Sequence, residues 1–113
     1  MHEISLMQSA LSMALELAKS KGATHIHRMT LSIGELSGVV PDALAFAFDV
    51  VSAGTLAEGA ELTLETVPTL CYCPHCWQEF HPTGWVYECP RCHHITHDIR
   101  QGQALELASL EVS

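Results

Sequence analysis

The chain has 113 residues, of which 48% are apolar and 16% charged, a balance that predicts one packed globular protein and excludes an intrinsically disordered one. Thirteen Asp and Glu residues against five Lys and Arg residues give a formal charge of −8, which argues against nucleic acid and an anionic membrane surface as partners. The longest apolar run has six residues, too few to cross a bilayer, and the start Met1-His2-Glu3-Ile4 lacks the basic and apolar regions of a signal peptide. We therefore expect a cytoplasmic protein with no membrane segment.

The first third of the chain predicts three elements. Residues 2–7 alternate apolar and polar side chains, which is typical of a short strand. Residues 8–21 repeat apolar side chains at intervals of three and four, which predicts a helix, and Gly22 is the expected end of it. Residues 24–33 alternate again and predict a strand. Its core-facing side chains are expected to be Met29, Leu31 and Ile33.

The rest of the chain predicts a second helix and two more strands. Pro41 suits the first turn of a helix that runs to about Ser52. Residues 60–67 and 104–112 alternate like strands, the latter with a slip of phase that indicates a bulge. The simplest topology pairs these two strands antiparallel, with the segment between them as an insert. This order predicts an α+β fold, with two helices on a small mixed β-sheet.

The insert differs sharply in composition from its surroundings. Residues 70–100 contain all five cysteines, five of the eight histidines and both tryptophans, without a helical period. A segment of this size buries too little apolar surface to fold alone and needs a metal or a disulfide. We therefore divide the chain into an α+β domain, residues 1–69 plus 101–113, and a metal-binding module, residues 70–100.

Two matched turns within the module predict a zinc site. Cys73-Pro74-His75-Cys76 and Cys89-Pro90-Arg91-Cys92 are separated by twelve residues, in which Pro82-Thr83-Gly84 is the expected turn of a hairpin. Two such pairs supply four thiolates to a tetrahedral Zn²⁺, and a closed set of four cysteines is structural rather than catalytic. The alternative is a pair of redox disulfides, which a single Cys-x-x-Cys beside a βαβ unit would favour. The repeat favours a four-cysteine zinc ribbon.

The module holds further potential ligands besides these four cysteines. Cys71 competes with Cys73 as the first ligand, but only Cys73 belongs to a matched Cys-Pro-x-Cys turn, so Cys71 is expected to be a bystander. The five histidines of the module are expected to lie on the surface, with contact to a ligand shell or to a second, weaker metal as the alternative. They are His75, His81, His93, His94 and His97.

The first residues offer a different kind of metal site. The α-amine of Met1, the amide nitrogen of His2 and the ring of His2 together form fused chelate rings suited to Ni²⁺ or Cu²⁺. Glu3 is a further ligand or an outer acceptor for those ligands. Taken alone, a histidine at this position is more often a surface residue.

Three motifs along the chain point to a family. They are Met1-His2-Glu3-Ile4-Ser5-Leu6 at the start, Ile33-Gly34-Glu35-Leu36-Ser37 in the middle, and the two Cys-x-x-Cys pairs. With them the chain resembles, over its full length, the HypA/HybF family of hydrogenase-maturation nickel chaperones. The resemblance implies delivery of Ni²⁺ to the large subunit precursor of [NiFe]-hydrogenase, together with a HypB-type GTPase.

The resemblance also implies roles for individual residues. His2 maps to the nickel ligand of the family and Glu3 to a residue that affects nickel binding. Some members use an acidic residue early in the second helix, for which Asp42 is the nearest candidate. The structural zinc would be held by Cys73, Cys76, Cys89 and Cys92.

Two other classes of protein compete with a nickel carrier. The first is a zinc-ribbon adaptor that binds a protein partner and no nickel. The second is an enzyme, such as a thiol oxidoreductase or zinc hydrolase, but the sequence has no nucleophile elbow, no His-Glu-x-x-His and no phosphate loop. We therefore expect no catalytic residues, and a monomer or weak homodimer.

Overall fold

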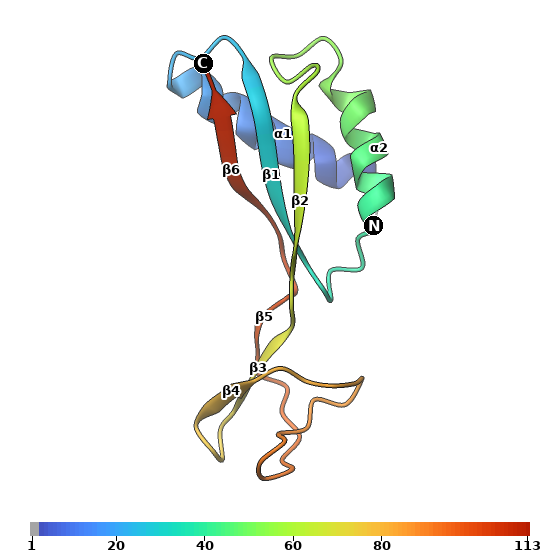
Figure 1. The fold of residues 1–113 in the computed structure, drawn as a ribbon, viewed down its shortest axis with the longest axis vertical. Helices are drawn as coiled ribbons and strands as arrows, with labels where there is room; N and C mark the ends of the chain where they lie inside the picture. Colours follow the sequence, from blue (N-terminus) through green and yellow to red (C-terminus); the bar gives the residue numbers. More distant parts are fainter. Residues whose placement is uncertain (1–2) are drawn as a thin grey trace. The chain divides into compact units, whose positions relative to one another are not determined.

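A computed structural model describes residues 3–113. These residues form two helices and two three-stranded sheets, with strand orders β2-β1-β6 and β4-β3-β5 (Figure 1). The chain divides into two compact units, and the second takes in Ile33–Gly38 and Thr66–Leu105. The elements are α1 Glu3–Ser20, β1 Ile26–Gly34, α2 Pro41–Ser52, β2 Glu61–Val67, β3 Leu70–Cys73, β4 Gln78–Phe80, β5 Ile99–Gln101 and β6 Leu105–Val112.

Helix α1 begins earlier than the sequence pattern predicts. The expected strand over residues 2–7 is wrong in its described part, because α1 already begins at Glu3. Met7 extends the series of buried positions by one helical turn, whereas Ile4, which suggested the strand, is 45% exposed. Burial at the helical period therefore outweighs a short alternation. The buried side chains of α1 are Met7, Leu11, Ala14 and Ala18.

Gly22 ends this helix as predicted. Its φ is +71°, and its N–H donates to the Lys19 carbonyl at 3.0 Å. The N–H of Ala23 donates back to the Ala18 carbonyl, also at 3.0 Å, which completes a Schellman motif. The chain is thereby turned toward β1.

The first sheet is mixed, with β1 at its centre. Ser113 N–H donates to the His25 carbonyl at 3.0 Å and Gly34 N–H to the Ala104 carbonyl at 2.8 Å, so β6 runs antiparallel to β1. Strand β2 runs parallel to β1 (Figure 1). The predicted pairing of residues 60–67 with 104–112 is therefore wrong. Strand β1 is the most buried strand of this sheet, with Met29, Leu31 and Ile33 buried as expected.

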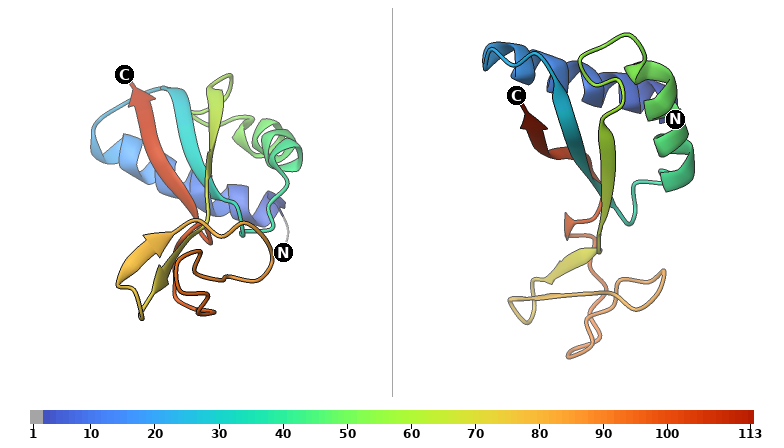
Figure 2. Two further views of the ribbon diagram at one scale, coloured as in Figure 1. Left: turned by 60° about the horizontal axis from the view of Figure 1, so that its bottom comes forward. Right: turned by 45° about the horizontal axis from the view of Figure 1, so that its top comes forward.

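Both helices cover one face of this sheet (Figure 2). Helix α2 begins at Pro41 and ends at Ser52, as predicted. Leu44, Ala47 and Phe48 are its buried apolar side chains, and α2 packs on α1. Two helices on a small mixed sheet confirm the predicted fold class. Neither helix combines the length and the apolar character that a bilayer span requires.

The second sheet belongs to the cysteine-rich unit. Strands β3 and β4 form an antiparallel hairpin in which Cys71 pairs with Phe80 and Cys73 with Gln78. The turn of this hairpin is the first cysteine pair itself, so the predicted hairpin turn at Pro82-Thr83-Gly84 is wrong. The N–H of Trp77 donates to the Cys73 carbonyl at 2.8 Å and closes the turn. This early closure leaves the rest of the spacer as loop.

The loop after β1 also belongs to the second unit. Three successive N–H groups bind the two chain segments that enter and leave the cysteine-rich region. Glu35 N–H donates to the Val67 carbonyl at 2.9 Å, on the segment that enters the region. The N–H groups of Gly34 and Leu36 donate to the carbonyls of Ala104 and Gly102, on the segment that leaves it. Gly34 allows this approach, since a Cβ on it would lie 2.3 Å from the Gly102 carbonyl oxygen. We call this set of contacts the clasp.

Candidate metal centre

The two cysteine turns share one backbone geometry. His93 N–H donates to the Cys89 carbonyl at 2.9 Å, the same bond that Trp77 makes to Cys73 in the first turn. Trp77 and His93 both have positive φ, at 55° and 65°, immediately after the second cysteine of their turns. Each turn therefore presents two sulfurs on one side, and the sequence repeat is a structural repeat.

The four sulfurs of these turns meet at one point. The Sγ atoms of Cys73, Cys76, Cys89 and Cys92 all lie within 4.8 Å of one another, the one such group of potential metal ligands among residues 3–113. The Sγ atoms of Cys73 and Cys92 are 3.5 Å apart, and those of Cys76 and Cys89 are 3.9 Å apart. A tetrahedral zinc ion with Zn–S distances of about 2.3 Å needs sulfurs roughly 3.8 Å apart. The donor set and its spacing therefore fit Zn²⁺.

The surrounding protein treats the four thiols unequally. Backbone N–H groups of Cys92 and Arg91 bind the Cys89 sulfur and lower the pKa of this thiol to about 7. Hydrogen bonding to Cys92 and burial raise the pKa of Cys76 to about 12. Without an ion the Cys76 thiol keeps its proton, and a bound dication displaces that proton. Metal binding and proton release are therefore linked at this site.

Cys71 lies outside the four-sulfur group. It is fully buried on β3, in an apolar cluster with Phe80, and Tyr87 and Ile99 pack against this cluster. Burial raises the pKa of the Cys71 thiol. A protonated, packed thiol of this kind serves as a small core side chain.

The histidines of the unit have partners of their own. The rings of His75 and His94 stack, with centroids 4.0 Å apart, and His93 Nδ1 lies 3.2 Å from a Glu88 carboxylate oxygen. His81 Nδ1 lies 2.8 Å from the carbonyl oxygen of Thr69. These contacts account for four of the five histidines that the sequence singled out.

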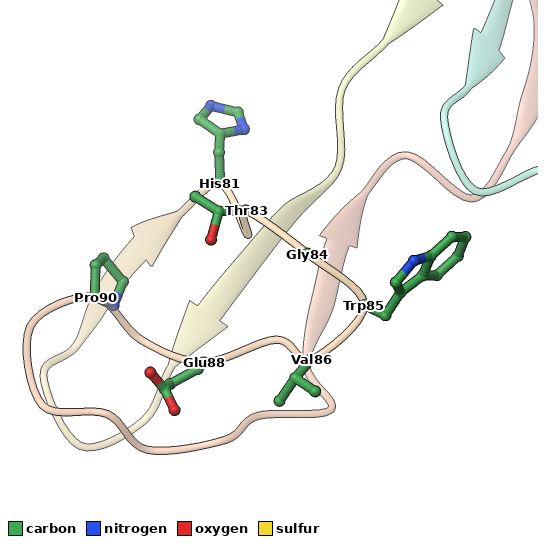
Figure 3. Close-up of a pocket in the computed structure, with 7 residues that line it drawn as sticks. All are labelled: His81, Thr83, Gly84, Trp85, Val86, Glu88 and Pro90. Carbon is green, nitrogen blue, oxygen red and sulfur yellow. The ribbon is translucent and has the colours of Figure 1, made fainter.

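The spacer loop forms a pocket whose lining includes none of the four cysteines. His81, Trp85 and Glu88 are among the residues that line it, and they point in different directions (Figure 3). Trp85 is 93% exposed. Because these side chains do not converge, the pocket offers no second set of metal ligands.

The predicted nickel ligand His2 lies outside the described residues. Glu3 lies in the first turn of α1 and Asp42 in the first turn of α2. Glu3 lines a pocket between the two helices with Ala43 and Phe46 of α2. The structure therefore describes the protein surface around Glu3.

Sequence reasoning missed the residues that support the cysteine turns. Thr96 is buried, its hydroxyl donates to the Tyr72 carbonyl at 2.8 Å, and it accepts the N–H of Asp98 at 3.1 Å. Thr96 thus connects the segment after the second cysteine turn to β3. No local pattern identifies such a residue. Trp77 and His93, by contrast, occupy equivalent positions in the two sequence repeats and share a positive φ.

Comparison with known proteins agrees with this architecture. Residues 1–112 match the family described as "Hydrogenase/urease nickel incorporation, metallochaperone, hypA". The chain belongs to the HypA family. It is 47% identical over 112 residues to the "Hydrogenase maturation factor HypA" of Picosynechococcus sp., and 38% identical to that of Acidithiobacillus ferrooxidans, in each case over 99% of both chains.

Solved structures of the HypA family share the fold. The solution structure of the Ni metallochaperone HypA from Helicobacter pylori matches with a TM-score of 0.76 and 30% identity, over 99% of this chain and 97% of that chain. The predicted resemblance is thereby confirmed. The family consists of nickel metallochaperones for hydrogenase maturation, and the four-cysteine group of this chain is consistent with a structural zinc.

Proposed function

We propose that this protein binds Ni²⁺ at its N-terminus and delivers it to the large subunit precursor of a [NiFe]-hydrogenase. The proposal rests chiefly on membership of the HypA family over residues 1–112, a match that includes the Met-His-Glu start. The ligands are the α-amine, the amide nitrogen and the ring of His2, with Glu3 as a further ligand or an acceptor for them.

The cysteine group supports this division of labour. We assign one Zn²⁺ to Cys73, Cys76, Cys89 and Cys92, four ligands that complete a tetrahedral shell. Such a shell has no open position for exchange with a partner. A carrier must release its ion, and a site built on the first residues of a chain has fewer metal–ligand bonds to break. Cargo and structural metal therefore use different sites.

The proposed setting follows from the chemistry of both metals. Thiolate ligands persist in the reducing cytoplasm, where we place the protein. Nothing in the described residues suggests a nucleotide site of its own, so we assign the energy-dependent step to a HypB-type GTPase partner. The protein acts as a carrier in this scheme, with no catalytic residue.

Replacing His2 with Ala tests the nickel assignment. We expect the tight Ni²⁺ equivalent of the untagged, zinc-loaded chain to be lost, because the fused chelate rings need the His2 imidazole. Zinc content should stay at one per chain. Isothermal titration with Ni²⁺, with metal content measured by mass spectrometry, gives both quantities.

Two further variants of this chain serve as controls for the test. An N-terminal extension that leaves His2 in place removes the free α-amine and should also abolish tight binding. His81→Asn, a histidine change in the other unit, should leave it intact. Tight nickel binding by His2→Ala would refute the N-terminal site and favour a zinc-ribbon adaptor.

A further inference from the structure

Two histidine rings meet at the start of strand β1, in the first compact unit. The ring centroids of His25 and His27 are 4.5 Å apart, with the ring planes at 71°. Residues two apart on a strand project from the same face, with backbone positions about 6.5–7 Å apart. The two rings therefore lean toward each other.

Ser113, the last residue of the sequence, holds both histidines. Ser113 N–H donates to the His25 carbonyl at 3.0 Å, and His25 N–H donates to the Ser113 carbonyl at 3.2 Å. The side chain of Ser113 lies against the second ring, with Oγ 2.6 Å from His27 Nε2. Because the pair is ordered in advance, a ligand that bridges it loses little further conformational freedom.

The charged groups nearby leave this face open to a cation. Arg28, the cationic neighbour in sequence, binds Glu61 at 2.9 Å and Glu111 at 3.1 Å. Its charge is thus balanced by two carboxylates. His27 is exposed and His25 half-buried, so water can complete the shell of an ion bound there.

We propose that His25 and His27 form a second, exchangeable site for a borderline divalent cation such as Ni²⁺, Cu²⁺ or Zn²⁺. Neutral imidazole nitrogens are ligands that these ions favour, whereas Mg²⁺ and Ca²⁺ favour oxygen. With two protein ligands, the site binds more weakly than the four-cysteine group and releases its ion to a competing chelator.

This site is separate from the proposed nickel site at the N-terminus. Helix α1 has 18 residues, and at about 1.5 Å per residue it extends roughly 27 Å. Glu3 begins that helix, whereas His25 follows its other end by five residues. No single ion can contact both ends of α1, so the two sites load independently.

The experiment uses the zinc-loaded full chain carrying His2→Ala, which silences the N-terminal site. Isothermal titration with Ni²⁺ alone should show one weaker equivalent per chain. His25→Asn and His27→Asn, made separately in this background, should each weaken it at least about tenfold, since loss of an indirect partner already costs about 10–100-fold in metal affinity.

His81→Asn in the same background is the matched control and should leave this weaker equivalent unchanged. Helical circular dichroism verifies folding, because both substituted positions lie outside the two helices. Absence of the weaker equivalent, or its persistence in both His25→Asn and His27→Asn, would overturn the proposal. Either result leaves the His2 experiment with the native chain unaffected.

Discussion

The residue after each cysteine turn adopts a backbone conformation that L-amino acids rarely use. Trp77 and His93 have φ values of 55° and 65°, in the left-handed region. For a residue with a Cβ this conformation costs roughly 1–2 kcal/mol. The side chain of Trp77 returns little of that energy, since it is 80% exposed. The cysteine-rich unit therefore carries strain at the positions that align its sulfurs.

Replacing Trp77 with Gly should stabilise the zinc-loaded protein by about 0.5–1 kcal/mol, because relief of the left-handed strain exceeds the added entropy of an unfolded glycine. The resistance of bound zinc to a competing chelator measures the effect. Trp85→Gly is the matched control, because Trp85 is also largely exposed but has no positive φ. Equal gains in the two variants would show that loss of an exposed indole, not backbone strain, is responsible.

Among the elements, the loop after β1 has a structural role that its motif did not reveal. Through the clasp, Gly34, Glu35 and Leu36 bind both chain segments that lead to the cysteine turns. The hydroxyl of Thr69 adds a bond to a Glu35 carboxylate oxygen at 3.2 Å. All of these bonds lie within the second unit.

Gly34→Ala should destabilise the protein by about 1–3 kcal/mol, the usual cost of overpacking. The new Cβ would lie 2.3 Å from the Gly102 carbonyl oxygen, so the backbone must shift. Thermal unfolding gives the stability change, and amide exchange at Leu36 reports the clasp. Gly84→Ala is the control, since nothing lies within 4 Å of a Cβ there. An unchanged midpoint for Gly34→Ala would contradict the close approach.

For the molecule as a whole, the two compact units hold different kinds of structure. Both helices belong to the first unit, and all five cysteines belong to the second. The apolar cluster of the second unit is small and is built largely from cysteines. We expect the second unit to depend on its metal for folding, and the first to fold on its own apolar core.

Cys89→Ala should therefore abolish zinc binding and unfold the second unit, while the helical circular dichroism of α1 and α2 persists. Amide signals of β3 to β5 in a heteronuclear NMR spectrum report the second unit. Cys71→Ala is the matched control and should retain one zinc per chain, because Cys71 lies outside the four-sulfur group. Loss of zinc from Cys71→Ala would instead identify Cys71 as a ligand.

Local chemistry determined much of this protein from the sequence alone. The repeated Cys-Pro-x-Cys turns predict the four-sulfur group, Gly22 the end of α1, and Pro41 the start of α2. Alternation also predicts the burial of Met29, Leu31 and Ile33 on β1. Each of these features depends on a few neighbouring residues, whose backbone preferences and side-chain chemistry are independent of the rest of the fold.

Only the tertiary structure decided features that depend on distant parts of the chain. Strand β1 lies between β2 and β6 and is the most buried of the three, and Met7 draws the first residues of α1 into a helix by packing in the core. The close approach of the His25 and His27 rings likewise depends on the pairing with Ser113, remote in sequence. Burial and long-range pairing outweigh short patterns because they involve larger free energies than local propensity does.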